Sequence, residues 1–454
     1  MITHTCDVAL EWMSGILRER MHDGLRCRYI PDENRIALSM AGAGQQIFIE
    51  CTSDFSPSAL ERHPPAEWNP LQEEISLPGT GKLPAPGVVR LDHPIIERLP
   101  NGDAILRYDI LHLAFWMMAR IEELGDGPRD EHERFPASQS LAYKHAFLER
   151  PLVDEWIEVL RQITRIVWPA IALTESRFRI DLSHDVDAPS RYVFQNWPMT
   201  MRAVASDLAV HRDLPSALYG LSSRFRRHTS IPDHDRYNTF DWFMDTSESI
   251  GEASTFYFIS GQTSPNRDAD YRLDHPAIAD LMKKIVARGH RIGLHPSYNT
   301  FDDPAALSAE ARTLRARLSS LGIMQGEIGS RMHYLRWKYP DTLVALERAG
   351  LVRDATLSFA DHPGFRCGTC FAYQGLDPLE GRILDLRLHP LVAMECTITD
   401  QRYLGLGLGQ EAFDKFAELK DACRKVNGTF SLLWHNTRVA KPEERALYAS
   451  VVNQ

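Results

Sequence analysis

The chain has 454 residues, 51 of them basic and 61 acidic, and its formal net charge at pH 7 is −10. This length exceeds one ordinary hydrophobic core, so we expect two domains or one barrel with a large extension. The acidic balance lacks the positive field that binding to nucleic acid or to an anionic membrane surface requires.

The sequence gives no sign of export or of membrane insertion. Residues 1–21 lack a basic stretch followed by an apolar one, and no run of about eighteen apolar residues occurs. Seven cysteines, an odd number, indicate reduced thiols. Cys367 and Cys370 form a single Cys-x-x-Cys without a second pair, so we interpret them as loop thiols rather than as a zinc site. We expect a cytoplasmic protein without a membrane span; its oligomeric state is not encoded in any recognisable pattern.

Residues 1–170 combine short strand-like runs with helices. Gln46–Glu50 alternates apolar and polar residues as a strand does, and apolar spacing predicts helices over 110–124 and 153–167. Segments rich in Gly and Pro mark loops. We therefore predict an N-terminal α+β domain over residues 1–170 and a second domain over 171–454.

From Phe178 onward, predicted strands alternate with predicted helices. The strands lie at 178–182, 254–259 and 291–294, and the helices at 276–288, 304–321, 339–349 and 411–426. Such alternation indicates a parallel sheet.

The first of these strands runs into a segment that carries two carboxylates. Asp185 and Asp187 are two residues apart, so they share one face of an extended segment. A turn expected at Ala188-Pro189 lets one carboxylate hold a metal while the other meets a water. An aspartate-rich turn without chemistry is the alternative, because Asp favours turns through local hydrogen bonds.

An insert over residues 191–243 interrupts the alternation and is rich in Arg, His, Pro and aromatic residues. It either shapes substrate binding or covers hydrophobic surface. Its basic run, Arg224–His228, is interpreted as a solvated helix end rather than as a nucleic-acid site.

Three later segments also place polar side chains at predicted strand ends, at His295, Arg331 and His435. Each alone is more often a structural residue. Together with the aspartate pair, they are typical of a β/α barrel whose strand ends converge on one site.

Residues 175–440 resemble the polysaccharide deacetylases with a NodB-like domain, carbohydrate esterase family 4, as a divergent branch. The residues that carry the likeness stand in the family's order of base, metal ligand, second ligand, arginine and acid: Asp185, Asp187, His295, Arg331 and His435. The resemblance implies an α/β fold, a distorted (β/α) barrel of NodB type behind the N-terminal α+β domain.

The N-terminal part resembles the uncharacterised domain that precedes the deacetylase domain in this branch. Two motifs carry this likeness, Phe115–Glu123 and Arg129–Pro136. The likeness implies the domain order and no chemistry.

The deacetylase resemblance also implies a role for each site residue. Asp187 and His295 would bind a divalent metal, and carboxylate with imidazole ligands favours zinc. Asp185 would take a proton from the attacking water, with Arg331 keeping it ionised by a charge-assisted hydrogen bond. His435 would protonate the departing amine.

The chain departs from the family at the second histidine ligand. Asn299 stands four residues after His295, and an amide oxygen is a poorer zinc ligand than an imidazole. Three possibilities remain open: Asn299 still coordinates, His184 or His333 replaces it, or metal binding is weak or absent. Asp354 is a candidate for supporting the site from behind.

The function implied by the resemblance is that of a metal-dependent hydrolase that removes an acetyl group from an N-acetylated sugar in polysaccharide or glycolipid metabolism. The expected partner is thus a carbohydrate and not nucleic acid. Two alternatives remain, hydrolysis of another linear or cyclic amide, and a non-catalytic pseudoenzyme that binds a glycan or a protein. A well-folded protein without metal would favour the pseudoenzyme.

Overall fold

The computed structural model describes residues 2–56, 59–60, 63–77 and 81–454. The chain packs into two compact units. Unit 1 comprises Met1–Arg179, Leu357–Val392 and Glu418–Phe430, and unit 2 comprises Ile180–Thr356, Ala393–Ala417 and Ser431–Gln454. Each unit is therefore assembled from three separate stretches of chain. The domain division expected at residue 170 stays a prediction.

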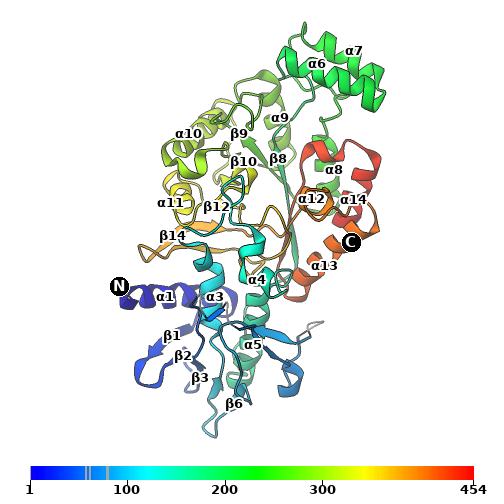
Figure 1. The fold of residues 1–454 in the computed structure, drawn as a ribbon. Coiled ribbons are helices and arrows are strands. Elements are labelled where there is room, and N and C mark those ends of the chain that lie inside the picture. The colour runs from blue at the N-terminus through cyan, green and yellow to red at the C-terminus, as the bar shows by residue number, and fades with distance from the viewer. Residues whose placement is uncertain (1, 57–58, 61–62, 78–80) are drawn as a thin grey trace. The chain divides into compact units, whose positions relative to one another are not determined.

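Unit 1 contains a five-stranded sheet in the order β1-β2-β3-β7-β6 (Figure 1). All its pairs are antiparallel except β3 with β7. Its strands are β1 Leu25–Ile30, β2 Arg35–Met40, β3 Gln46–Glu50, β6 Ile96–Arg98 and β7 Ala104–Leu106. The unit also holds two antiparallel pairs, β4 Ala66–Trp68 with β5 Leu83–Ala85 and β13 Tyr373–Asp377 with β14 Arg382–Leu388.

The helices of unit 1 are α1 Ile2–Arg20, α3 Ile110–Met118, α4 Leu141–Lys144 and α5 Leu152–Val167. The helix predicted over 153–167 is confirmed by α5, whose Trp156 stacks on Trp68 at 5.4 Å between ring centroids. The helix predicted over 110–124 ends earlier, at Met118. Arg120 adopts a left-handed conformation with φ of 45°, which an α-helix does not accommodate.

Arg120 belongs to a buried charge network that joins two segments of unit 1. Its Nε donates to Glu123 Oε1 at 2.7 Å, and Arg366 donates to both oxygens of the same carboxylate, at 2.8 and 2.6 Å. All three side chains are almost fully shielded from solvent. Burial alone would raise the pKa of Glu123, but the two guanidinium groups, Arg366 first, lower it to about 2.

Unit 2 is built on a parallel sheet in the order β12-β11-β10-β9-β8-β16-β15. Its strands are β8 Arg179–Val186, β9 Thr255–Ile259, β10 Arg291–His295, β11 Gly329–Ser330, β12 Arg353–Asp354, β15 Ala393–Met394 and β16 Thr429–Leu433. The strands predicted at 254–259 and 291–294 are confirmed. The strand predicted at 178–182 continues to Val186, so Asp185 lies within it.

The parallel α/β class is confirmed for unit 2, whereas a closed barrel is not. In the described part of the chain, the strand order is open, because β15 lies at its end and neighbours β16 alone. Strands β11, β12 and β15 have two residues each, which is too short to complete the hydrogen-bonded wall of a barrel.

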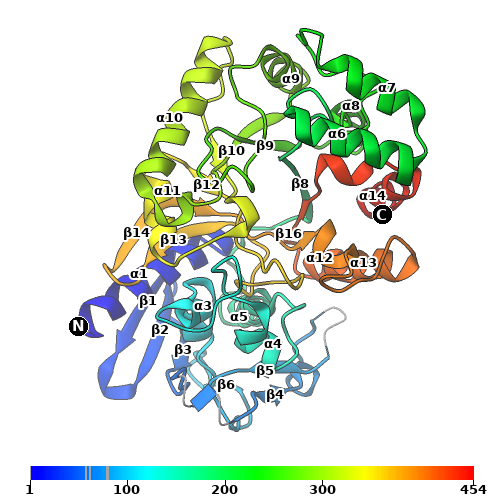
Figure 2. The ribbon, with the colours of Figure 1, turned by 45° about the horizontal axis from the view of Figure 1, so that its top comes forward.

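Helices follow the strands of unit 2 and lie around its sheet (Figures 1 and 2). They are α8 Phe240–Ser249, α9 Pro276–Ala287, α10 Pro304–Ser320, α11 Asp341–Arg348, α12 Glu395–Thr399 and α14 Pro442–Asn453. Helix α13, Gln410–Lys425, begins in unit 2 and continues into unit 1. The predicted helices at 276–288, 304–321, 339–349 and 411–426 are confirmed within a few residues. In the described part of the chain, every helix is too short or too polar to span a bilayer.

The insert between β8 and α8 is largely helical. It forms α6 Trp197–Ser206, a π-helical turn over Asp207–His211, and α7 Leu214–Ser223. Helices α6 and α7 lie side by side in Figures 1 and 2.

Candidate functional site

The site lies at the carboxyl ends of the unit 2 strands. Asp187 directly follows β8, His295 ends β10 and Arg331 follows β11, while Glu395 and His435 come after β15 and β16. Because parallel strands present their carboxyl ends at one edge of a sheet, these side chains meet although they are far apart in sequence.

Asp187, His295 and His333 form a cluster that is suited to a metal ion. Each offers one ligand atom, and these atoms lie within 4.8 Å of one another. Asp187 Oδ1 is 3.3 Å from His295 Nε2 and 3.7 Å from His333 Nε2. This oxygen is shielded from solvent, and no described residue donates a hydrogen bond of good geometry to it. A shielded carboxylate oxygen that faces two imidazole nitrogens fits a divalent cation.

Hydrogen bonds to the far side of each imidazole ring set its orientation. His295 Nδ1 lies 2.5 Å from the carbonyl oxygen of Arg331, and His333 Nδ1 lies 3.2 Å from Asp268 Oδ1. A carbonyl or carboxylate oxygen only accepts, so Nδ1 carries the proton in both rings. In the neutral rings, Nε2 then presents its lone pair toward Asp187, as a metal ligand must.

The second carboxylate of the predicted pair is held by a buried arginine. Arg331 Nη1 donates to Asp185 Oδ1 at 3.1 Å, and Asp185 Oδ2 lies 3.5 Å from His295 Nε2. Arg331 is itself fixed by donation from Nε to the Ala355 carbonyl at 3.0 Å and by the Tyr257 ring at 4.7 Å. Asp185 is thus kept beside the cluster in a position to accept a proton.

The late histidine is paired with a buried glutamate. His435 Nδ1 lies 2.6 Å from Glu395 Oε1, and its Nε2 lies 3.7 Å from Asp187 Oδ2. Burial alone would lower the pKa of His435, but the charge and the hydrogen bond of Glu395 raise it to about 10. Burial would likewise raise the pKa of Asp187, and the neighbouring histidines, His333 first, hold it well below its usual range.

The structure does not bring Asn299 to this cluster. Its Nδ2 donates to the Thr263 carbonyl at 3.0 Å, and its Oδ1 accepts from Arg336 Nη1 at 3.2 Å. Both polar ends of the amide are therefore engaged elsewhere. His333, one of the two replacements considered from the sequence, lies in the cluster with Asp187 and His295 instead.

His184, the other replacement considered, points to the opposite face of β8. Its Nδ1 bonds to the Trp434 carbonyl at 2.8 Å, and its ring packs on Phe243 at 3.8 Å between centroids. Burial lowers the pKa of His184 to about 3. It is a neutral core histidine, as expected from the alternation of side chains along a strand.

Asp354 stabilises the segment that carries Arg331. Its Oδ2 accepts from the hydroxyls of Ser330 and Thr356, at 2.8 Å each. Burial raises the pKa of Asp354 to about 6. Asp354 thus lies behind the site, where a residue that supports the site is expected.

Asp268 and Glu395 were not singled out in the sequence. Asp268 lies in an acidic stretch beyond the carboxyl end of β9, and Glu395 follows the two-residue strand β15. For Asp268, the available signal was an acidic residue in the loop that follows a predicted strand. Neither β15 nor the pairing of Glu395 with His435 has a pattern of its own in the sequence.

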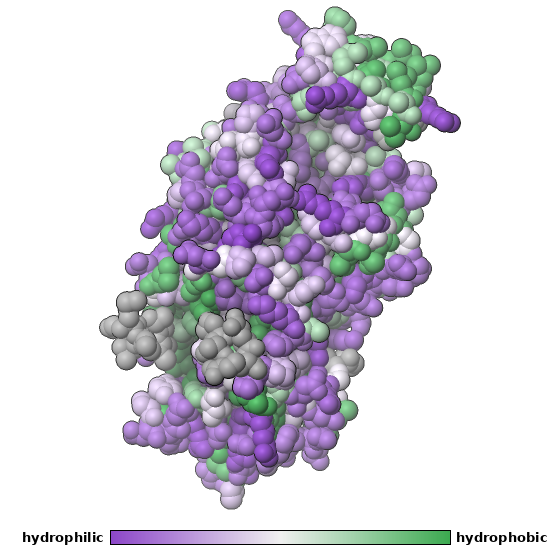
Figure 3. All heavy atoms as spheres, viewed as in Figure 1, coloured by the Kyte–Doolittle hydropathy of each residue, from purple (hydrophilic) through white to green (hydrophobic). Residues whose placement is uncertain are grey.

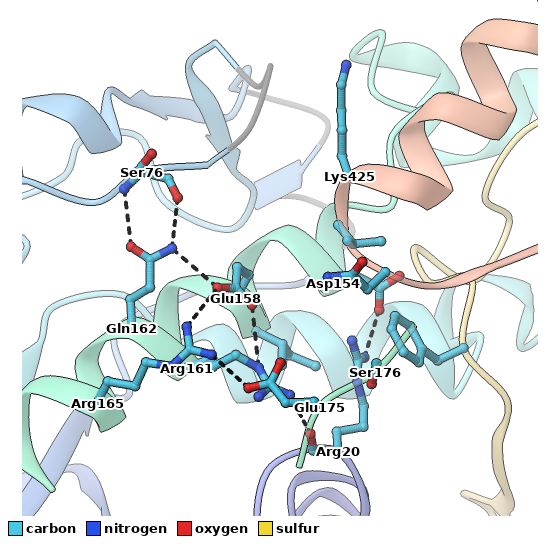
Figure 4. A pocket seen from close by; sticks show the side chains of 14 residues that line it. Arg20, Ser76, Asp154, Glu158, Arg161, Gln162, Arg165, Glu175, Ser176 and Lys425 are labelled. Atoms are coloured by element: carbon cyan, nitrogen blue, oxygen red, sulfur yellow. Dashed lines mark hydrogen bonds and ion pairs between the residues drawn. The ribbon is translucent and has the colours of Figure 1, made fainter. Parts of the chain in front are cut away.

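Unit 1 contains a separate polar cavity of about 400 Å³ (Figure 4). Several of its charged side chains pair within the cavity wall: Arg20 with Asp154 at 2.7 Å and Arg165 with Glu175 at 3.2 Å. These pairs indicate a structural role. Among the described residues, the groups suited to metal binding contain neither Cys367 nor Cys370.

Comparisons with known proteins gave one family match and two structural alignments. Residues 17–169 match DUF7033, a family of unknown function. A putative polysaccharide deacetylase from Mycobacterium smegmatis aligns with 15% identity and a TM-score of 0.40, covering 62% of this chain and 85% of that one. Puue allantoinase aligns with 14% identity and a TM-score of 0.35, covering 61% and 84%. No curated protein matches the chain.

Proposed function

We propose that the protein is a metal-dependent hydrolase that removes the acetyl group from an N-acetylated sugar. The observation that carries this proposal is the shielded Asp187 Oδ1, faced by Nε2 of His295 and Nε2 of His333. A proton acceptor and a proton donor stand beside this cluster, namely Asp185 and His435. Amide hydrolysis needs these three elements together.

The metal would be held by Asp187, His295 and His333, with Asp268 fixing the orientation of His333. A bound zinc ion supplies Lewis-acid polarisation of the substrate carbonyl oxygen. Two imidazole nitrogens and one carboxylate would form a ligand set of the kind that catalytic zinc sites use.

The chain's own residues would move the protons. Asp185, aimed by its hydrogen bond from Arg331, would take a proton from the attacking water. His435 donates a proton from Nε2 to the departing amine, since its Nδ1 is engaged by Glu395. Glu395 is a positioning residue, because it acts through His435 and keeps Nε2 directed at the site.

An aromatic surface beside the cluster supports a sugar as substrate. Tyr334 is half-exposed, and its ring lies 4.7 Å from that of His333 and 5.2 Å from that of Tyr298. Aromatic walls with a few convergent polar groups are typical of small-molecule sites. We propose that Tyr334 contacts the sugar ring.

Acetate release from N-acetylglucosamine oligomers tests the proposed activity. The protein would be stripped with chelator, reloaded with one equivalent of zinc and assayed beside the stripped form. We expect acetate only from the loaded protein. If the protein binds zinc and releases no acetate but opens a cyclic amide such as allantoin, the substrate proposal fails and the hydrolase proposal stands.

The metal ligands are tested by comparing His333→Ala with Asn299→Ala. Loss of one imidazole ligand should weaken zinc binding by at least about tenfold, whereas loss of the Asn299 amide should leave it unchanged. Isothermal titration with zinc measures both. The reverse ranking of the two variants would restore Asn299 as the third ligand.

A further inference from the structure

The α6–α7 pair carries an unusual share of the exposed apolar side chains. Of the seventeen large apolar side chains that are exposed among the described residues, eight fall between Trp197 and Phe225. We call these eight residues the apolar face: Trp197, Met201, Leu208, Val210, Leu214, Leu218, Leu221 and Phe225. Figure 3 shows hydrophobic surface gathered over α7 and α6, at the upper right.

The apolar face is one continuous helical surface rather than scattered residues. Along α6 its members begin at Trp197 and Met201, and along α7 they recur at Leu214, Leu218 and Leu221, the three- and four-residue spacing of one helix side. The two rows meet where the start of α6 approaches the end of α7. There the rings of Trp197 and Phe225 lie 5.9 Å apart.

The core between the two helices of the insert is formed by other side chains. The pair has its own small core, formed by Tyr192, Ala203, Val204, Ala217 and Tyr219. Asp207 is fully shielded and accepts from Arg191 Nε at 3.0 Å. At Gly220 a Cβ would lie 2.4 Å from the Tyr192 ring, so the glycine allows close packing there. The inner side of the pair is thus already filled, and the apolar face points outward.

Basic residues accompany the apolar face. Residues 196–228 contain five arginines and two aspartates in a chain whose net charge is −10. One of the aspartates, Asp207, is paired with Arg191. Arg202, Arg212, Arg226 and Arg227 are exposed. Local charge is therefore opposite in sign to that of the whole molecule.

We propose that the α6–α7 pair docks on an anionic lipid surface, with the apolar face entering the headgroup region. Trp, Phe and Leu beside arginines are the composition of helices that lie in the membrane interface, and neither helix needs to span the bilayer. The arginines contact lipid phosphates, and the acidic remainder of the chain is repelled. Docking through a second copy of the chain is less favourable, because symmetric pairing of this face brings arginines against arginines.

Vesicle co-sedimentation of the full chain tests this proposal. The native protein should bind vesicles of phosphatidylcholine containing one part in three of phosphatidylglycerol, and bind phosphatidylcholine alone far more weakly. Leu218→Asp should reduce binding by about tenfold or more, since it places a carboxylate in the face. Leu71→Asp is the matched control, because Leu71 is 70% and Leu218 58% exposed, and it should bind as the native protein does. Arg226→Glu with Arg227→Glu should remove the preference for the anionic vesicles.

Three outcomes would overturn the proposal. The first is that the native protein binds neither kind of vesicle. The second is that Leu218→Asp binds vesicles as well as the native chain does. The third is that light scattering shows a dimer of the native chain that Leu218→Asp dissociates. Circular dichroism of each variant establishes that it is folded. Because Leu218 lies outside the small core of the pair, we expect native spectra.

Discussion

Protein carrying Asp185→Asn is expected to bind zinc as the native chain does and to hydrolyse substrate about 10²–10⁴-fold more slowly. An amide has the size of the carboxylate and still accepts the hydrogen bond from Arg331, so the local packing is kept. It does not accept a proton at neutral pH. The variant therefore removes the proposed base and little else. The turnover number and the zinc content, measured on the same sample, check this prediction.

Asp187→Ala is the informative partner of that variant. Removing the carboxylate that faces both imidazoles should lower zinc content and activity together. The two variants thus separate proton transfer from metal binding. Near-native turnover by Asp185→Asn would show that another group is the base, whereas loss of zinc in both variants would show that Asp185 is itself a ligand.

Glu123→Gln is expected to lower the free energy of unfolding by about 3–5 kcal/mol, because it leaves two buried guanidinium groups facing a neutral amide. Arg120 and Arg366 both donate to this carboxylate, and both are almost fully shielded from solvent. Urea denaturation of the variant and of the native chain gives the difference.

The difference in free energy of unfolding between Glu123→Gln and the native chain should become smaller at acidic pH. The pKa of Glu123 is lowered from 4.5 to about 2, so its stabilising contribution is complete above about pH 4.5 and is lost as the pH falls toward 2. Glu67→Gln is the control, because the Glu67–Lys82 pair is exposed and its loss should change stability by less than about 1 kcal/mol. Equal effects of the two variants would show that the buried network contributes no more than a surface pair.

Much of the site was predictable because it depends on strand ends. Asp185, Asp187 and His295 belong to regular strands or follow them directly, so period-two alternation and the parallel arrangement bring them together. The place of His333, the third member of the cluster, does not follow from strand alternation. His333 is followed by Tyr334 and Leu335, both in the left-handed region, with φ of 61° and 55°. Without a glycine or asparagine at these positions, no residue signalled this turn.

The net charge was a poor guide to the surface of the insert. A chain with a charge of −10 was expected to avoid anionic membranes, yet one helical pair concentrates five arginines beside apolar side chains. Composition averages over the whole surface, whereas docking depends on one patch. The sequence marks the insert as an interruption of the strand–helix alternation. The two roles considered for it there do not include docking on a lipid surface.

The discontinuity of unit 1 has a consequence during synthesis of the protein. The buried carboxylate of Glu123 acquires its second guanidinium only with Arg366, and the unit is complete only with Phe430. During translation, the N-terminal segment therefore emerges from the ribosome long before the later segments of unit 1. Until those segments are made, the charge of Glu123 is incompletely neutralised and the hydrophobic core of the unit is incomplete. Unit 1 then folds late in synthesis. We expect chaperones that bind unfolded chains to bind the exposed N-terminal segment.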